Sequence, residues 1–202
     1  MAIIFTNKTI HGNVHVYEDK IIKLFNTNDI MVDQECLLSL MFSQYIPNYV
    51  PIIYNYHKEQ GYTYLMMEKI IGITFREFLK YKHDISLKYK IVKELVEGLK
   101  NIHKLGYCHK DFHDENIIIT TNYHVKIIDF GCTQIISEDG LYDDYIYLYM
   151  HIAHLLFEID AEIDEVLYVT DELGPEDVVG NNLKIAQNLY GILENIYIEN
   201  NL

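Results

Sequence analysis

Apolar residues change their spacing once along this chain of 202 residues, near residue 72. Before that point, alternating runs rich in β-branched and aromatic residues predict short strands, beginning with a hairpin over residues 14–17 and 21–25. After it, five apolar residues recur at the spacing of one helix face: Leu87, Ile91, Leu95, Leu99 and Ile102. Strands and helices segregated in this way indicate an α+β fold, with a small β-rich lobe followed by a helical lobe.

One helix is predicted inside the β-rich part, between Met31 and Pro47, because residues there recur at helical spacing and proline ends the segment. Two further strands are expected over residues 50–56 and 62–67, separated by a polar turn. The β-rich part is therefore predicted to be a small antiparallel sheet with one inserted helix.

The long helical stripe has a capping signal at each end, with Ser86 as its expected N-cap and Gly106 after its last turn. A second hairpin is predicted over residues 116–120 and 125–128, and a further helix is expected over residues 143–158.

The C-terminal part is less informative. Residues 158–177 are acidic, and we interpret them as a solvated face, because the glycine and final glutamate of a calcium loop are not placed correctly. A final helix is expected between residues 183 and 196.

The charge balance limits the partners that this chain can bind. It has 30 acidic and 16 basic residues, a formal net charge of −14, and scattered lysines and arginines. Such a field repels phosphate backbones, so no nucleic-acid partner is expected. The apolar runs are too short to cross a bilayer, the N-terminus lacks a secretory pattern, and three widely spaced cysteines favour a reducing compartment. We expect a cytoplasmic protein with no membrane partner.

The segment that carries most of the chemistry is His109-Lys110-Asp111-Phe112-His113-Asp114-Glu115-Asn116, which is followed by Asp129-Phe130-Gly131. The two runs resemble the H-R-D-L-x-x-x-N and D-F-G motifs of the eukaryotic-type protein kinase family, in the same order. The flanking residues 101–108 and 125–128 resemble the helix end and the strand that accompany these motifs. The resemblance covers about residues 5–158 and implies a bilobal kinase-like fold with a reduced helical C-lobe.

The same residues suit phosphoryl transfer on chemical grounds. Asn116 and Asp129 offer hard oxygen ligands for Mg²⁺, which neutralises charge on the phosphates of ATP. Asp111 lies on the loop between them and can accept the proton of an acceptor hydroxyl. The resemblance therefore implies that Asp111 is the catalytic base and that Asn116 and Asp129 are the metal ligands.

A phosphate anchor is also implied. Lys23 closes Ile21-Ile22-Lys23, which resembles the V-A-I-K strand whose lysine contacts ATP, and Glu35 heads a segment that resembles the partner helix. Lys20 is a competing candidate, but it belongs to the predicted turn. The alternative is that Lys23 and Glu35 are two charges without mutual contact.

The glycine-rich loop departs from the family pattern. Of G-x-G-x-x-G-x-V, Gly12 and Val14 remain, whereas Asn7 and Thr9 stand at the first two glycine positions. Glycine lets backbone N–H groups approach phosphates closely, so we expect modest nucleotide affinity or a different path of this loop.

Residues 64–70 resemble the strand and hinge between the lobes. Backbone groups at Glu68 and Ile70 are expected to pair with the adenine edge, and either Met66 or Met67 is the gatekeeper. The alternative is a buried methionine-rich strand that contacts no ligand.

Three residues of the catalytic loop differ from the family pattern, and these differences bear on which group receives the phosphate. Lys110 replaces the family's arginine and lacks its bidentate fork. His113 replaces a lysine that neutralises the γ-phosphate, which a histidine does only when protonated. His113 also resembles the loop of aminoglycoside and choline phosphotransferases, and a structural histidine is the alternative. Glu115 stands where tyrosine kinases carry arginine.

The segment after Gly131 is short. It soon reaches Asp143-Asp144-Tyr145, which resemble the start of the central helix of the C-lobe, and no A-P-E motif intervenes. A conventional activation segment and its peptide-docking platform are not expected, so activity should not require phosphorylation there.

We predict one kinase-like domain over residues 1–202, with an N-lobe at 1–67, a hinge at 68–71 and a C-lobe at 72–202. Its predicted activity is transfer of the γ-phosphoryl group of ATP, with Mg²⁺, to a protein hydroxyl, Ser/Thr in preference to Tyr. The target protein and the oligomeric state stay open. The alternatives are a small-molecule phosphotransferase of the same fold and a non-catalytic nucleotide-binding scaffold. Such minimal kinases are expected in viral or parasitic genomes, and a viral protein would act in the host cytoplasm.

Overall fold

A computed structural model describes residues 3–9, 12–25 and 30–157 of the chain. Its largest sheet has five antiparallel strands in the order β1-β2-β3-β5-β4, and one helix packs beside it. The bounds are β1 (Phe5–Thr9), β2 (Gly12–Val16), β3 (Lys20–Phe25), α1 (Ile30–Tyr45), β4 (Ile53–Glu59) and β5 (Tyr62–Glu68). The predicted antiparallel N-lobe with a single helix is confirmed.

The β4–β5 hairpin is tighter than predicted. Gln60 and Gly61 both have positive φ angles, 51° and 82°, as in the two-residue turn whose twist matches that of the flanking strands. The ladder therefore continues to the pair Glu59↔Tyr62. The predicted turn over residues 57–61 is wrong, because the polar residues at its start belong to an exposed strand.

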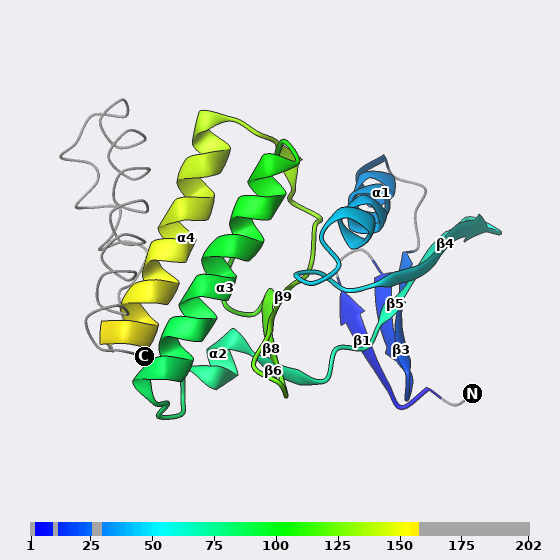
Figure 1. Ribbon diagram of the computed structural model, residues 1–202. Coiled ribbons are helices and arrows are strands. Elements are labelled where there is room, and N and C mark those ends of the chain that lie inside the picture. Colours follow the sequence, from blue (N-terminus) through cyan, green and yellow to red (C-terminus); the bar gives the residue numbers. More distant parts are fainter. Residues whose placement is uncertain (1–2, 10–11, 26–29, 158–202) are drawn as a thin grey trace.

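The helical part contains two long helices that lie side by side, with short strands between them and the N-lobe (Figure 1). Its elements are β6 (Gly72–Thr74), α2 (Phe75–Phe78), α3 (Ile85–Lys104), β7 (Tyr107–Cys108), β8 (Ile117–Thr120), β9 (Val125–Ile127), β10 (Gln134–Ile135) and α4 (Glu138–Phe157). β6, β8 and β9 form one small sheet, and β7 pairs with β10. The α+β fold with segregated strands and helices is confirmed.

The N-terminus of α3 is capped by Asp84 and not by the predicted Ser86. The Asp84 carboxylate accepts the Leu87 N–H at 2.9 Å, and the Ser86 hydroxyl donates to the same carboxylate at 2.6 Å. Asp84 has extended backbone angles, as an N-cap residue requires. Gly106, beyond the other end of α3, has a φ of 89°, which glycine adopts without a steric penalty.

The main hydrophobic core joins the two parts of the molecule. Leu38 and Phe42 of α1, together with Ile46 and Val50 after it, are buried in the same cluster as the apolar face of α3. A smaller cluster packs the other side of α1 against β3 and β5; its buried members are Phe25, Val32, Cys36, Leu65 and Met67. α1 is therefore held between the sheet and the helical part, and this placement fixes the position of its polar residues.

Three further predictions concern the C-terminal part. α4 begins at Glu138, five residues before the predicted start at residue 143. The acidic stretch at 158–177 and the helix expected between 183 and 196 lie outside the described residues. Within the described ranges, no helix is both long enough and apolar enough to span a membrane.

Candidate active site

A lysine, a glutamate and an aspartate from three elements meet beside the five-stranded sheet. The Nζ atom of Lys23 in β3 lies 2.7 Å from Oε1 of Glu35 in α1 and 3.4 Å from Oδ2 of Asp129, which follows β9. Burial alone lowers the pKa of Lys23, but Glu35 and Asp129 outweigh burial, and the pKa is raised. Burial alone raises the pKa of Asp129, but Lys23 and the Gly131 amide reverse the effect. Lys23 and Glu35 therefore form an ion pair, against the alternative of two separate charges.

The register of the sheet determines which residues share a face with Lys23. Lys23 pairs with Val14 of β2 and with Leu65 of β5, and residues directly opposite in antiparallel strands point to the same face. Met67, two residues from Leu65, is buried on that face, whereas Met66 points to the other face. Of the two gatekeeper candidates, Met67 is the one that shares the face of Lys23.

Gly12 has a structural role in the sheet. It lies at the start of β2, opposite Phe25, and a Cβ atom there would be 2.0 Å from the Leu24 carbonyl oxygen. That separation is far below any real contact, so close strand pairing by itself accounts for a glycine at this position.

The hinge residues connect β5 to β6. The Glu68 amide donates to the Ile52 carbonyl at 2.8 Å, and its carboxylate accepts the Ile52 N–H at 3.0 Å. The same carboxylate lies 3.5 Å from Nζ of Lys126. Ile70 is half-buried in the connection. The Glu68 side chain therefore stabilises the segment before β4, and it does not extend toward Lys23.

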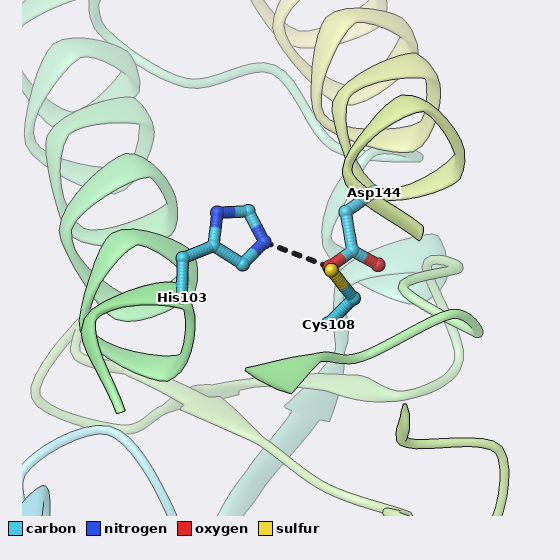
Figure 2. Close-up of side chains that lie close together, drawn as sticks. All are labelled: His103, Cys108 and Asp144. Atoms are coloured by element: carbon cyan, nitrogen blue, oxygen red, sulfur yellow. Dashed lines mark hydrogen bonds and ion pairs between the residues drawn. The ribbon is translucent and has the colours of Figure 1, made fainter. Parts of the chain in front are cut away.

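The start of the loop over residues 109–116 is fixed by Asp144, a fully buried residue of α4. Its carboxylate accepts the His109 N–H at 2.8 Å and the Lys110 N–H at 2.7 Å. The His103 ring of α3 donates to the same carboxylate at 2.8 Å, as Figure 2 shows. Asp144 thus ties the loop to both long helices.

The residues around Asp144 include side chains of the kinds that bind metal ions. His103, Cys108 and Asp144 each offer one ligand atom, and these atoms lie within 4.8 Å of one another (Figure 2). Both Asp144 oxygens already accept N–H donors, and burial raises the pKa of the Cys108 thiol, which disfavours the thiolate that a metal requires. Hydrogen bonding accounts for this cluster without a metal.

The loop itself brings three of the predicted residues together. The Asn116 amide nitrogen donates to the carbonyl and to Oδ2 of Asp111, both at 2.9 Å. Nε2 of His113 lies 3.1 Å from that nitrogen and 3.5 Å from Oδ2 of Asp111, while Nδ1 accepts the Glu115 N–H at 3.2 Å. Because the Asn116 nitrogen faces Asp111, the amide oxygen is the atom that can bind a cation.

A buried ring connects this loop to Asp129. The His109 side chain donates to the Ile128 carbonyl at 3.1 Å and packs edge-on against Phe130, with ring centroids 5.4 Å apart. Lys110 and Asp129 both have positive φ angles, 68° and 65°, which non-glycine residues rarely adopt. Strained backbone on both sides of a polar cluster is typical of functional sites.

Oxygen ligands for a divalent cation are thus available on two adjacent segments. The Ile128 N–H donates to the Asn116 carbonyl at 2.9 Å, which brings the segments of Asn116 and Asp129 side by side. The lowered pKa of Asp129 keeps its carboxylate ionised, and hard anionic and amide oxygens are the donors that Mg²⁺ prefers. The residues present fit a magnesium ion.

Two contacts of this site were not predicted. Gln34 of α1 donates to the Thr133 carbonyl at 3.0 Å, and Arg76 of α2 donates to Asp114 in the loop. The partners are 99 and 38 residues apart in the sequence, and neither Gln34 nor Arg76 belongs to a recognisable motif. Only the fold brings these pairs together.

The fold and the arrangement of the site are those of a kinase-like class of protein. A family model described as the protein kinase domain matches residues 13–153. The chain therefore belongs to the protein kinase family.

Several serine/threonine kinases resemble parts of the chain. A probable serine/threonine-protein kinase of Dictyostelium discoideum is 35% identical over 88 residues, 42% of this chain and 6% of that protein. Serine/threonine-protein kinase cds1 of Schizosaccharomyces pombe is 35% identical over 81 residues, 39% of this chain and 18% of that protein. The probable kinase pknA2 of Bifidobacterium longum is 31% identical over 91 residues, 44% of this chain and 12% of that protein. The chain spans less than a fifth of each of these relatives.

Proposed function

We propose that the chain is an ATP- and Mg²⁺-dependent protein kinase that phosphorylates a protein hydroxyl, Ser/Thr in preference to Tyr. The observation that carries the proposal is the joint placement of Lys23, Glu35 and Asp129 next to a loop that holds Asp111 and Asn116. Relatives named as serine/threonine kinases support the choice of acceptor.

Each residue has a role that its contacts support. Lys23, held by Glu35, is the cation for the α- and β-phosphates of ATP. Asn116 and Asp129 hold the magnesium ion, which supplies positive charge beside the phosphates when bound. Asp111 orients the acceptor hydroxyl and accepts its proton, as the oxygen–phosphorus bond forms and the bond to the β-phosphate oxygen breaks.

We assign the adenine ring of ATP to the face of the five-stranded sheet that carries Lys23. Val14 and Met67 lie on that face, and Met67 is the proposed gatekeeper. Because the Glu68 side chain is engaged with Ile52, the hinge contacts of Glu68 and Ile70 with adenine come from their backbone groups. Gly12 contributes by allowing β2 to lie close to β3.

We also propose that activity does not depend on phosphorylation of the segment after Gly131. Lys110, at the position of the family's arginine, forms an ion pair with Asp143, so its charge is already compensated within the chain. The contact of Gln34 with Thr133 ties α1 to this short segment. These contacts support the proposal that the segment after Gly131 takes up its active position on folding, without phosphorylation.

A small-molecule phosphotransferase is the second candidate, and the contact of His113 with Asp111 and Asn116 favours it. A panel of acceptors separates the two: generic Ser/Thr and Tyr proteins on one side, aminoglycosides, choline and sugars on the other. With radiolabelled ATP, we expect label on serine or threonine of a protein. Label confined to a small molecule would overturn the proposal, and binding of Mg·ATP without transfer to any acceptor would favour the non-catalytic scaffold.

A further inference from the structure

Arg76 of α2 holds the middle of the loop that contains Asp111 and Asn116. Its Nε donates to Oδ2 of Asp114 and its Nη2 to Oδ1 of Asp114, both at 3.0 Å, and Nη1 lies 2.8 Å from Oε1 of Glu115. The Arg76 amide also donates to the Asp114 carbonyl at 3.2 Å. One residue thus contacts two successive loop residues through a bidentate fork, a further ion pair and its backbone.

The helix that carries Arg76 is held firmly by its neighbours, although the guanidinium group of Arg76 is exposed. α2 follows β6 directly, and its first turn is closed by the Thr74 hydroxyl, which accepts the Glu77 N–H at 3.2 Å. Phe75 and Phe78, which flank Arg76 in α2, are 0% and 2% exposed. A side chain that leaves a buried helix can transmit the position of that helix to the loop.

The loop is anchored along its length, and one of these contacts is from the His151 ring of α4, which donates to the Phe112 carbonyl at 2.7 Å. Asp144 holds its start through the His109 and Lys110 amides, β8 continues from its end at Ile117, and Arg76 holds the residues between. The segment held by Arg76 lies between the proposed base and one of the proposed metal ligands. A displacement there moves both groups relative to each other.

Building on the proposed kinase function, we propose that Arg76 is a positioning residue for phosphoryl transfer, and that its two-pronged contact with Asp114 keeps Asp111 and Asn116 in the productive arrangement. The fork is the essential feature, because a planar guanidinium fixes a carboxylate in distance and in orientation. A lysine at this position would retain the charge and lose the second prong.

The first experiment measures the loop directly. Amide hydrogen exchange of the full chain is followed by mass spectrometry in wild type, Arg76→Ala, Arg76→Lys and Lys80→Ala. Lys80 is the matched control, since it is an exposed cation just after α2 whose ion pair with Glu77 does not involve the loop. In Arg76→Ala we expect the Glu115 and Asn116 amides to exchange about tenfold faster, with no change in Lys80→Ala.

The second experiment measures turnover. We expect Arg76→Ala to lower kcat by about tenfold or more, because small displacements of reacting groups have large effects on rate. The KM for Mg·ATP should change less than about threefold, since Lys23, Glu35 and Asp129 keep their contacts and only Asn116 among the proposed nucleotide and metal ligands is displaced. Arg76→Lys should stay close to Arg76→Ala, and both variants should melt within about 4 °C of wild type.

The outcomes are distinct. Unchanged amide exchange in Arg76→Ala would overturn the proposed role of Arg76. Full kcat in Arg76→Lys would show that the charge and not the bidentate contact matters, and this would overturn the proposal as well. A loss of kcat equal in Arg76→Ala and Lys80→Ala contradicts a specific role. If wild type phosphorylates no acceptor, the proposed function fails. The exchange data still show in that case whether the contact of Arg76 with Asp114 holds the loop in place.

Discussion

Ionised and neutral buried groups have different tasks in this molecule. Lys23 keeps its charge because Glu35 and Asp129 compensate for its burial. Two buried histidines of the described residues, His109 and His151, have pKa values lowered by burial and act as neutral hydrogen-bond partners of loop carbonyls. Among the described residues, no buried side-chain polar atom lacks a hydrogen-bond partner. Lys23 is thus kept charged by its ion-pair partners, whereas the two histidines act as neutral hydrogen-bond donors.

The state of His151 makes folding stability depend on pH. Burial lowers its pKa from 6.5 to about 4 in the folded chain, where its ring donates to the Phe112 carbonyl at 2.7 Å. As pH falls below 6.5, the unfolded chain binds a proton first, so stability present above 6.5 is lost toward pH 4. Between pH 7 and pH 5 this group should remove about 2 kcal/mol.

Urea unfolding of wild type and His151→Gln at the two pH values measures this effect. Glutamine can still donate to the Phe112 carbonyl but does not titrate. The variant should therefore lose about 2 kcal/mol less than wild type on acidification. Equal losses in the two proteins would show that His151 does not carry the effect.

Helices and strands with a clear period, and short strands joined by an evident turn such as β8 and β9, could be predicted, whereas isolated short elements could not. The stripe of α3 and the alternation of β2 and β3 are encoded locally, and so they follow from the sequence. β6, β7, β10 and α2 have two to four residues each, too few to show a period. The three strands among them form because strands distant in sequence pair with them: β6 pairs with β8, and β7 pairs with β10.

Some residues of the proposed site could likewise be predicted from the sequence, and others needed the structure. The types and spacing of Asp111, Asn116 and Asp129 were visible in the sequence, because the chemistry of the loop fixes them. The sequence favours Lys23 because Lys20 is expected in a turn. That expectation is wrong, since Lys20 is the first residue of β3, but the position of the two lysines along the strand still favours Lys23. The two lysines are three residues apart, so they point to opposite faces; Nζ of Lys20 lies 5.9 Å from the centroid of the Tyr17 ring.

Mutations at the N-cap of α3 should change the stability of the chain. Asp84→Ala removes the acceptor for the Leu87 N–H and should lower the melting temperature by about 3 °C. Ser86→Ala removes a donor to Asp84 and leaves that acceptor in place, so its effect should be smaller. Thermal unfolding followed by circular dichroism compares the two. A larger effect in Ser86→Ala would identify Ser86 as the functional cap.

For the whole molecule, the continuous core implies that the two parts unfold together. Phe42 of α1 is fully buried, and its ring packs edge-on against Phe130, with centroids 4.8 Å apart, and against Tyr107, at 5.8 Å. The same helix provides Glu35 for the proposed site. Stability of the core and geometry of the site are therefore coupled through α1.

Phe42→Ala tests this coupling. Removing a fully buried ring should lower the free energy of unfolding by about 3–5 kcal/mol. Leu37→Ala is the matched control, because Leu37 is on the same helix and is 55% exposed; it should cost less than about 1 kcal/mol. Denaturant unfolding followed by two spectroscopic probes should show one coincident transition in wild type. Separate transitions would mean that the lobes are independent.

The central claim is that Lys23 and Asp111 serve one phosphotransfer site, and radiolabelled transfer from Mg·[γ-³²P]ATP tests it most directly. Wild type is compared with Asp111→Asn, Lys23→Met and Lys20→Met, the last as a control on the same strand. We expect wild type and Lys20→Met to label a protein acceptor, and the other two variants to fall by about 100-fold or more. No transfer by wild type to any acceptor, or undiminished labelling by Asp111→Asn, would contradict the account.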